Sequence, residues 1–271
     1  DDLPSMLAAE RALTAAIVCT PDDAHLADAS ALLHVGVPVY LEKPMTVHTA
    51  DADRLLDAAA ASERMLFVGH NMRYMSVVET MKSLIDDGAI GAVQAVWCRH
   101  FVGNGGDYYY RDWHADRSRS NSLLLQKGAH DLDVIHYLAG APTRRLQAFG
   151  KLAVYGDVAD RADNSDAITP EWFSMEHWPP RELTGLNPII DVEDLSQVNL
   201  ALANGVLATY SQCHFTPDYW RNYTVIGDAG RLENFGDGEG GVVRVWNRRH
   251  WYSADGDIEV PLHGDEDGHE D

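Results

Sequence analysis

The sequence predicts an α/β half followed by a second domain built on a large, mostly antiparallel sheet. Three short apolar runs between residues 15 and 69 alternate with helical segments of about ten residues, the βαβ pattern of a parallel, doubly wound sheet. From residue 93 onward, strand signals repeat, and one strong helical segment at 130–139 interrupts them. Runs of strands with few helices favour an antiparallel sheet. We therefore expect two domains, 1–73 and 74–271, with the boundary near 71–76.

Proline, glycine and capping residues mark the elements of the first half. We expect a helix at 5–13, strands at 15–20, 37–41 and 65–69, a second helix that closes near Gly36, and a third helix from about residue 49. Pro21, Asp22 and Asp23 suit the first turn of the second helix, where carboxylates meet the positive end of the helix dipole. Thr49 or Asp51 is expected to cap the third helix.

The second half begins with an amphipathic helix at 77–88. Strands are expected near 93–101, 146–155, 196–203, 206–213, 222–226 and 242–247. Residues 156–193 are rich in aspartate, proline and tryptophan and predict a long loop, which at that length is usually functional or disordered. The acidic segment from residue 264 is expected to be mobile.

Charge and cysteine content limit the partners and the compartment. The chain has 42 acidic and 21 basic residues, a formal net charge of −21, which repels nucleic acid and anionic lipid. Cys19, Cys98 and Cys213 are too few and too widely spaced for a disulfide framework or a metal-ligand pair, and no ligand spacing predicts a metal. No apolar segment approaches the ~18 residues of a membrane span. We therefore expect a cytoplasmic protein without nucleic-acid or membrane partners.

The most informative stretch is the apolar run 37–41 that ends in Glu42, Lys43 and Pro44. It predicts a buried strand that delivers an acid and a base to the rim of a sheet. In open α/β sheets, ligands bind outside the carboxyl ends of the strands. Lys43 is therefore a candidate site residue.

A second candidate surrounds the expected helix at 130–139. If His130 opens that helix, Asp133 lies one turn along on the same face and could bond one imidazole nitrogen, which sets the tautomer and suits acid/base work. Lys127 adds an ionisable group three residues before His130. A helix-terminal histidine with a capping aspartate is the alternative interpretation of His-x-x-Asp.

Several motifs together resemble one family. They are Glu42-Lys43-Pro44, Gly69-His70-Asn71-Met72-Arg73-Tyr74, Ile85-Asp86-Asp87-Gly88-Ala89-Ile90-Gly91, His130-Asp131-Leu132-Asp133 and Gly227-Asp228-Ala229-Gly230-Arg231-Leu232-Glu233. In this order and spacing, over roughly residues 5–250, they resemble the Gfo/Idh/MocA family of NAD(P)-dependent oxidoreductases.

The resemblance implies a partial Rossmann-type domain followed by an α+β domain whose large sheet forms a homo-oligomer interface. It implies NAD or NADP as cofactor and a sugar, polyol or related cyclic alcohol as substrate. Lys43 would reach the substrate hydroxyl or the nicotinamide ribose, and His130 would act as acid/base, with Lys127 and Asp133 beside it. The cofactor side would be lined by Thr20, Pro21, His25, Glu42, Lys43, Pro44 and Arg73.

Two departures from the family pattern bear on function. Many sugar and polyol dehydrogenases of the family carry an aspartate four residues before the histidine, where this chain has Gln126, and an amide cannot take a proton. No Gly-x-Gly-x-x-Gly follows an expected strand, so the phosphate-binding turn is absent from this chain. We therefore expect a fragment that lacks the N-terminal glycine-rich strand-turn-helix and the extreme C-terminus.

Three functions agree with these residues. The leading one is hydride transfer between NAD(P) and a sugar or polyol. The second is a redox-neutral lyase or glycoside-cleaving enzyme with retained NAD, favoured by Gln126 and Lys127. The third is a non-catalytic binding or assembly homologue, favoured by the missing glycine-rich turn.

Overall fold

The computed structural model describes residues 2–10, 12–165, 167 and 174–263. By its internal contacts the chain forms two units. The first contains residues 1–70 and 116–129, and the second contains residues 71–115 and 130–271. The segment 116–129 therefore groups with a part of the chain that ends 46 residues before it in sequence.

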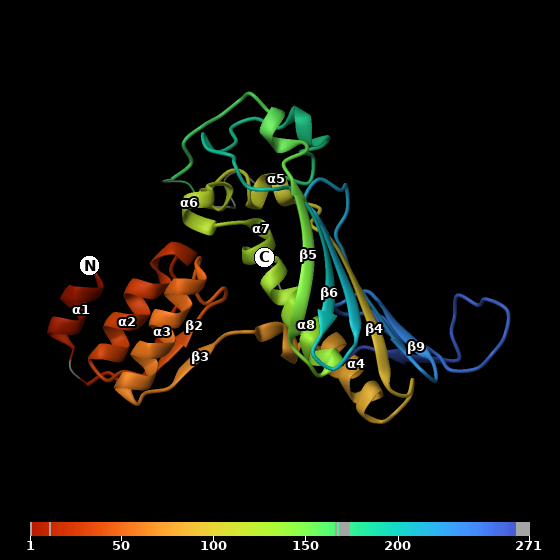
Figure 1. Ribbon diagram of the computed structural model, residues 1–271. Helices are drawn as coiled ribbons and strands as arrows, with labels where there is room; N and C mark the ends of the chain where they lie inside the picture. The colour runs from red at the N-terminus through yellow and green to blue at the C-terminus, as the bar shows by residue number, and fades with distance from the viewer. Residues whose placement is uncertain (1, 11, 166, 168–173, 264–271) are drawn as a thin grey trace. The chain divides into compact units, whose positions relative to one another are not determined.

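The first unit is built on a three-stranded parallel sheet in the order β1-β2-β3 (Figure 1). Its elements in chain order are α1 (Leu3–Ala9), β1 (Ala16–Val18), η1 (Asp22–Ala24), α2 (His25–His34), β2 (Val39–Leu41), α3 (Thr49–Ser62), β3 (Leu66–Val68), α6 (Arg117–Ser120) and α7 (Leu123–Gln126). The predicted parallel sheet with alternating helices is confirmed.

Apolar side chains of the strands and helices form the core of this unit. Val18 and Leu41 pack with Leu32 and Leu33 of α2 and with Leu55 of α3. The strands present these residues at every second position, as the pleat of a strand requires. Outside this cluster, Ile17 of β1 is 74% exposed.

Two local expectations in the first unit were wrong. The first helix covers Leu3–Ala9 and not 5–13, because Asp2 caps it by accepting a hydrogen bond from the Ser5 N–H, and its C-cap Glu10 is extended. The N-cap of α3 is His48, which makes no side-chain capping bond, whereas Thr49 already lies in the helix. Asp51 lies in the first turn, where its charge favours the helix dipole without capping it.

The second unit is built on an eight-stranded sheet in the order β11-β10-β9-β8-β4-β7-β6-β5 (Figure 1). The strands are β4 (Val93–Phe101), β5 (Thr143–Lys151), β6 (Leu195–Leu202), β7 (Leu207–Cys213), β8 (Trp220–Gly227), β9 (Arg231–Phe235), β10 (Val242–Trp246) and β11 (Ile258–Pro261). Only the β4–β7 pairing is parallel among these neighbours, so the mostly antiparallel sheet is confirmed.

Helices precede or follow these strands along the chain. They are η2 (Asn71–Tyr74), α4 (Ser76–Asp86), α5 (Gly105–Tyr108), η3 (Trp113–Ala115), α8 (Gly128–Ala139), η4 (Tyr155–Asp157) and η5 (Pro180–Glu182). The expected loop at 156–193 contains η5 and a parallel bridge between Arg161 and Leu186 in its described part. The acidic segment 264–271 lies outside the described residues.

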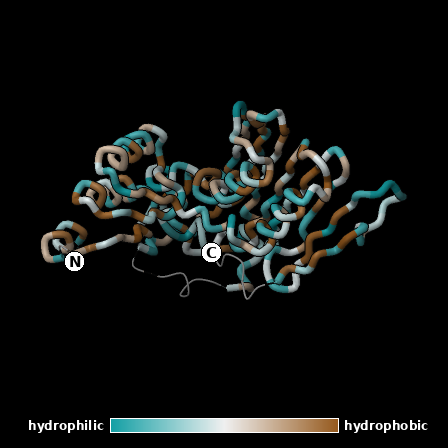
Figure 2. Tube along the Cα trace, turned by 90° about the horizontal axis from the view of Figure 1, so that it is seen from below, coloured by the Kyte–Doolittle hydropathy of each residue, from teal (hydrophilic) through white to brown (hydrophobic). Residues whose placement is uncertain are grey.

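The large sheet has two different faces. Along β4, Val96, Cys98 and His100 are buried, while Trp97 and Arg99 between them point to the other face. Figure 2 shows apolar and polar stretches interspersed along the trace. Within the described ranges, no helix is long and apolar enough to cross a membrane.

Candidate active site

The carboxyl ends of β1 and β2 bring the first group of predicted site residues to one edge of the parallel sheet. Val18 pairs with Leu41, so the segments that begin at Cys19 and Glu42 leave the sheet side by side. His25, at the start of α2, fastens these segments together. Its Nδ1 lies 2.8 Å from the carbonyl oxygen of Pro44, and its Nε2 lies 2.8 Å from that of Thr20. The motif Thr-Pro-x-x-x-His thus has a structural role in aligning the two strand ends.

Lys43 is held by the segment 116–129. Its ammonium donates a hydrogen bond of 3.1 Å to the carbonyl oxygen of Gln126. Arg119 pairs with Asp23 at 3.3 Å, and the Asn121 amide donates to the carbonyl oxygen of Val47, so the segment is fastened at three points. Because these contacts join residues up to 96 positions apart, sequence spacing could not reveal them.

The side chain of Gln126 is buried at this place, and so is Lys127. Gln126 is 8% exposed, and its Oε1 has no hydrogen-bond partner in the part of the chain that the structure describes. Lys127 is fully buried. A buried acceptor without a donor costs free energy. A ligand that supplies the missing donor is one explanation for such an acceptor.

Asp22 is a residue of this edge that the sequence interpretation treated only as a helix-start residue. It is 4% exposed, and its Oδ2 accepts no hydrogen bond from the described residues. Burial raises its pKa to about 7 from the ordinary 3.8; the Lys43 ammonium opposes this rise, and the negative charge of Asp23 adds to it. Burial at this position is a tertiary property, and no sequence signal marked it.

In the second unit, Asp133 forms a bidentate ion pair with Arg73. The Arg73 Nε donates to Asp133 Oδ2 at 2.7 Å, and Nη2 donates to Oδ1 at 2.6 Å. Arg73 also lies over the Tyr137 ring, 5.3 Å from its centroid. The pair fastens η2 to α8. The roles predicted for Arg73 at the cofactor and for Asp133 at His130 stay predictions.

His130 is 1% exposed and lies on the first turns of α8, next to Asp131. Asp131 is the centre of a buried polar network on the helix-covered face of the sheet. Its Oδ2 accepts from His100 Nδ1 at 3.0 Å and lies 2.9 Å from the Tyr210 hydroxyl. Its Oδ1 accepts from the Tyr223 hydroxyl and lies 3.3 Å from Arg221 Nε. The network fixes the start of α8 on strands β4, β7 and β8.

Electrostatics keep Asp131 ionised inside the protein. Burial would raise its pKa, but the Arg221 guanidinium, His100 and the Tyr223 hydroxyl together hold the pKa below its ordinary value. The sequence interpretation quoted Asp131 only as part of a motif. A signal was nevertheless present, because His100 and Arg221 occupy inward positions of strands, where charged residues are rare.

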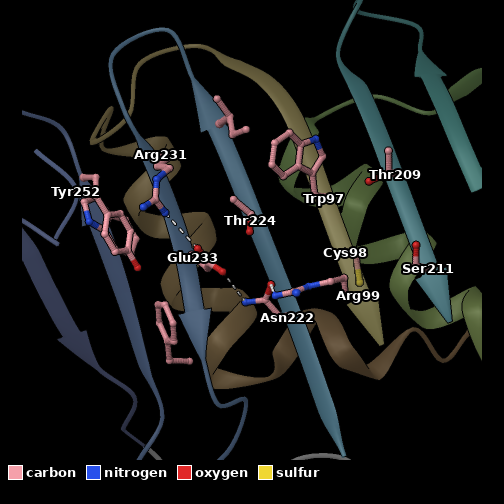
Figure 3. Close-up of a pocket in the computed structure, with 13 residues that line it drawn as sticks. Trp97, Cys98, Arg99, Thr209, Ser211, Asn222, Thr224, Arg231, Glu233 and Tyr252 are labelled. Carbon is pink, nitrogen blue, oxygen red and sulfur yellow. Dashed lines mark hydrogen bonds and ion pairs between the residues drawn. The ribbon is translucent and has the colours of Figure 1, made fainter. Parts of the chain in front are cut away.

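A separate hollow of about 660 Å³ lies on the open face of the large sheet (Figure 3). In its centre, Asn222 accepts a hydrogen bond from Arg99 and donates to Glu233, which also pairs with Arg231. The Arg231 guanidinium stacks on Trp246 with its carbon 3.5 Å from the ring centroid. Aromatic side chains, including Trp97 and Tyr252, form its walls. The side chains of this hollow are distinct from those at the ends of β1 and β2.

Comparison with known proteins connects both units to one family. Residues 1–70 match the model of the oxidoreductase family with an NAD-binding Rossmann fold, and residues 78–233 match the GFO/IDH/MocA C-terminal domain. The 2,7-anhydro-N-acetylneuraminate hydratase of Mediterraneibacter gnavus is 30% identical over 61% of this chain and 46% of its own length. The myo-inositol 2-dehydrogenase of Thermotoga maritima is 24% identical over 61% of this chain and 48% of its own length.

A solved structure of levoglucosan dehydrogenase superposes with a TM-score of 0.74 at 17% identity, covering 96% of this chain and 64% of that one. This likeness supports the fold. The chain spans about half the length of the two curated relatives. Because family models match both units in sequence order, the chain belongs to the GFO/IDH/MocA family.

Proposed function

We propose that the protein transfers a hydride between NAD or NADP and a sugar, polyol or related cyclic alcohol. The observation that carries this proposal is the placement of Lys43 at the carboxyl edge of the parallel sheet, bound to the carbonyl of Gln126. The acid/base role of His130 is proposed from the family motif His130-Asp131-Leu132-Asp133.

The residues of the strand ends fit the nicotinamide end of such a cofactor. They include buried polar atoms without partners among the described residues, Asp22 Oδ2 and Gln126 Oε1, at the edge where α/β sheets bind ligands. The residues that would line the cofactor are Thr20, Pro21, His25, Glu42, Lys43, Pro44 and Arg73. The bound nicotinamide would supply the hydride acceptor or donor.

The protein's side chains would divide the remaining work. The Lys43 ammonium would stabilise negative charge that develops on the substrate oxygen. His130 would accept the hydroxyl proton during oxidation and return it during reduction. Asp133 and Lys127 would adjust the orientation and charge around His130.

The proposal is tested by binding and turnover in the full-length protein. Purified protein should bind NAD or NADP, and Lys43→Met should lose about 10²-fold or more in kcat while keeping its circular dichroism spectrum. Lys82→Met is the matched control, because Lys82 pairs with Asp86 in the second unit, far along the chain from Lys43. Unchanged turnover in the Lys43 variant would refute the proposal.

A redox-neutral reaction with retained NAD is the second candidate. It is favoured by Gln126, which cannot take a proton, and by the hydratase among the relatives, since hydration involves no net redox change. Product formation from the purified protein without added cofactor, and without a net change at the reduced-nicotinamide absorbance band, would support this candidate over the first. Purified protein that binds no nicotinamide would instead favour a non-catalytic assembly role.

The open face of the large sheet is proposed as a homo-oligomer interface. Trp97 of β4, Phe149 of β5 and Leu207 of β7 point to this face and are 51%, 62% and 61% exposed. Large apolar side chains that are exposed on one sheet face favour a protein–protein contact. The hollow around Arg231 and Glu233 would supply polar contacts at the centre of the interface (Figure 3).

A cytoplasmic location is part of the proposal. Cys19, Cys98 and Cys213 are free thiols in the structure, which fits a reducing compartment. Cell fractionation with an antibody against the protein tests this assignment.

A further inference from the structure

The loop between β10 and β11, residues 247–257, carries an aromatic pair into solvent; we call this loop the arm. Trp251 is 96% exposed and Tyr252 is 84% exposed, more than any other large apolar side chain of the described residues. Arg248 and Arg249, just before them, are exposed as well. Tryptophan, tyrosine and arginine are the residue types that dominate the binding energy of protein interfaces. The arm therefore has the composition of a contact surface.

The arm has a fixed shape, because hydrogen bonds join its two ends to each other and to the sheet. Asp257 accepts from the backbone N–H groups of Asn247, at 2.9 Å, and Arg248, at 3.1 Å. The indole N–H of Trp246, at the end of β10, donates to the carbonyl oxygen of Ser253 at 2.8 Å. A loop that is already held in one conformation loses little conformational entropy when its tip binds.

The hollow on the open face of the sheet lies next to the arm. Its volume is about 660 Å³, and Tyr252 of the arm lines it together with Trp97 and Trp246 (Figure 3). Pockets of about 300–1,000 Å³ hold whole drug-sized molecules, so the hollow has room for an indole ring. Its aromatic walls and the Arg231 guanidinium suit such a ring, because both kinds of group stack on indole.

A protruding tryptophan and a hollow that fits it therefore lie side by side on one surface. Tyr252 lines the hollow of its own chain, while Trp251, one position earlier, is almost fully in solvent. In a two-fold symmetric dimer every contact between residues of the two copies occurs twice. A two-fold axis beside Tyr252 would thus bring each Trp251 to the hollow of the other copy.

The charges of the open face favour a second copy of the same acidic chain as the partner. Acidic side chains are few on this face, where Arg231 pairs with Glu233 and Arg244 pairs with Glu259. The charged residues at the open-face positions of the strands are Arg99, Arg145, Lys151, Arg231, Arg244, Glu233 and Glu259. Two chains of net charge −21 that meet here keep most of their carboxylates apart, which lowers their repulsion.

The area of the exchanged residues is large enough to matter. A buried tryptophan or tyrosine removes about 150–250 Å² from water, so Trp251 and Tyr252 of two arms would account for roughly 600–1,000 Å². A stable interface needs about 1,200–2,000 Å² in total. The exposed apolar side chains of the sheet face, such as Trp97 and Leu207, can supply the remainder.

We propose that two copies of the chain exchange their arms: Trp251 of each copy enters the hollow of the other and packs against Arg231. This inference rests on the proposed homo-oligomer interface and adds the contact that anchors it. The exchange also makes the interface specific, because a partner that lacks the hollow has no seat for Trp251.

Analytical ultracentrifugation of the full-length protein tests the exchange. Trp251→Ala should raise the dissociation constant of the dimer about 10³-fold, because two equivalent contacts are lost and each corresponds to a tryptophan hot spot. Thr209→Trp, which fills the hollow, should weaken the dimer to a similar extent. Trp178→Ala is the matched control: Trp178 is 46% exposed in the loop 156–193, and the dissociation constant should stay within about twofold. Circular dichroism checks that all three variants keep their fold.

A mixture of the two weakened variants distinguishes arm exchange from general damage to the face. In a mixed dimer, Trp251 of the Thr209→Trp chain can enter the unfilled hollow of the Trp251→Ala chain, so one of the two contacts is kept. The mixed dimer should therefore be about 30-fold tighter than a dimer of either variant alone. Equal affinities of the mixed and the separate dimers would overturn the proposal.

Fluorine NMR of protein labelled with 5-fluorotryptophan follows Trp251 directly. The resonance that is missing in Trp251→Ala should be accessible to a soluble paramagnetic agent in dilute protein and protected at concentrations where the dimer forms. A Trp251 resonance that stays accessible in the dimer would overturn the arm exchange and leave the sheet interface in place. A wild-type protein that is monomeric at every concentration would refute the proposed interface itself, and the exchange with it.

Discussion

Replacing Asp131 by asparagine tests the buried network that fixes the start of α8. The substitution keeps the shape of the side chain but removes the charge that faces Arg221, whose side chain is 1% exposed. Removing one partner of a buried ion pair costs about 3–5 kcal/mol, because the other charge is left uncompensated. Since whole domains are stable by only about 5–15 kcal/mol, Asp131→Asn should bring the second unit close to unfolding.

Tryptophan fluorescence in a urea titration measures this loss selectively. All seven tryptophans follow residue 96, and none occurs in 1–70 or 116–129, so the signal reports the second unit. Tyr223→Phe is the matched control, since it removes one hydroxyl donor but keeps both charges; it should cost about 1.5–3 kcal/mol, as for a hydrogen bond to a charged group. A loss below about 1 kcal/mol in Asp131→Asn would refute the reasoning.

The pH dependence gives a second check with a defined sign. The pKa of Asp131 is lower in the folded protein than in the unfolded chain, so its stabilisation is present above about pH 4 and is lost as the pH falls further. The free energy of unfolding of Asp131→Asn should therefore change less than that of the wild type between about pH 4 and pH 2. The combined variant Asp131→Asn with Arg221→Met should be more stable than the sum of the two single losses predicts.

Four further outcomes are expected. In urea unfolding, Gly91→Ala should destabilise the protein by about 1–3 kcal/mol more than Gly88→Ala. Both glycines have a positive φ, but of the two only position 91 would bring the new Cβ against a neighbour, Asp228 Oδ1 at 2.1 Å. The stability of Asp22→Asn relative to the wild type should increase by up to about 4 kcal/mol as the pH rises from about 4 to about 7, because the raised pKa of Asp22 disfavours the folded wild type over that range. The same difference between the thermal midpoints of variant and wild type at pH 5 and at pH 8 would contradict this. Trp97→Glu should dissociate the proposed oligomer in sedimentation, whereas Leu146→Glu, equally exposed on the opposite face, should leave it intact. Arg73→Ala should lower the free energy of unfolding by only about 1 kcal/mol in urea titrations, since the Arg73 side chain is 42% exposed. A larger loss would show that its pair with Asp133 is better shielded from water than this exposure suggests.

The sequence by itself determined the fold class, the family and the placement of Lys43 at a strand end. These features depend on local patterns: the βαβ alternation, the apolar run before Glu42, and motifs in a fixed order. Such patterns can be recognised in the sequence alone because the periods of helices and strands are properties of the backbone. Strand and helix types were therefore predictable, while their ends, as at α1 and α3, depended on which side chain satisfied the free N–H groups.

Tertiary structure alone decided the partners of the site residues. Lys43 meets the carbonyl of Gln126, 83 positions away, and Arg73 meets Asp133, 60 positions away. It also decided burial, which turns Asp22 from an ordinary helix-start aspartate into a group that titrates near neutral pH. Charge energies depend on distance and on exclusion from water, and both are set only when remote segments pack together. The sequence identified the residues of the proposed chemistry, and the folded chain determined which of their charges interact.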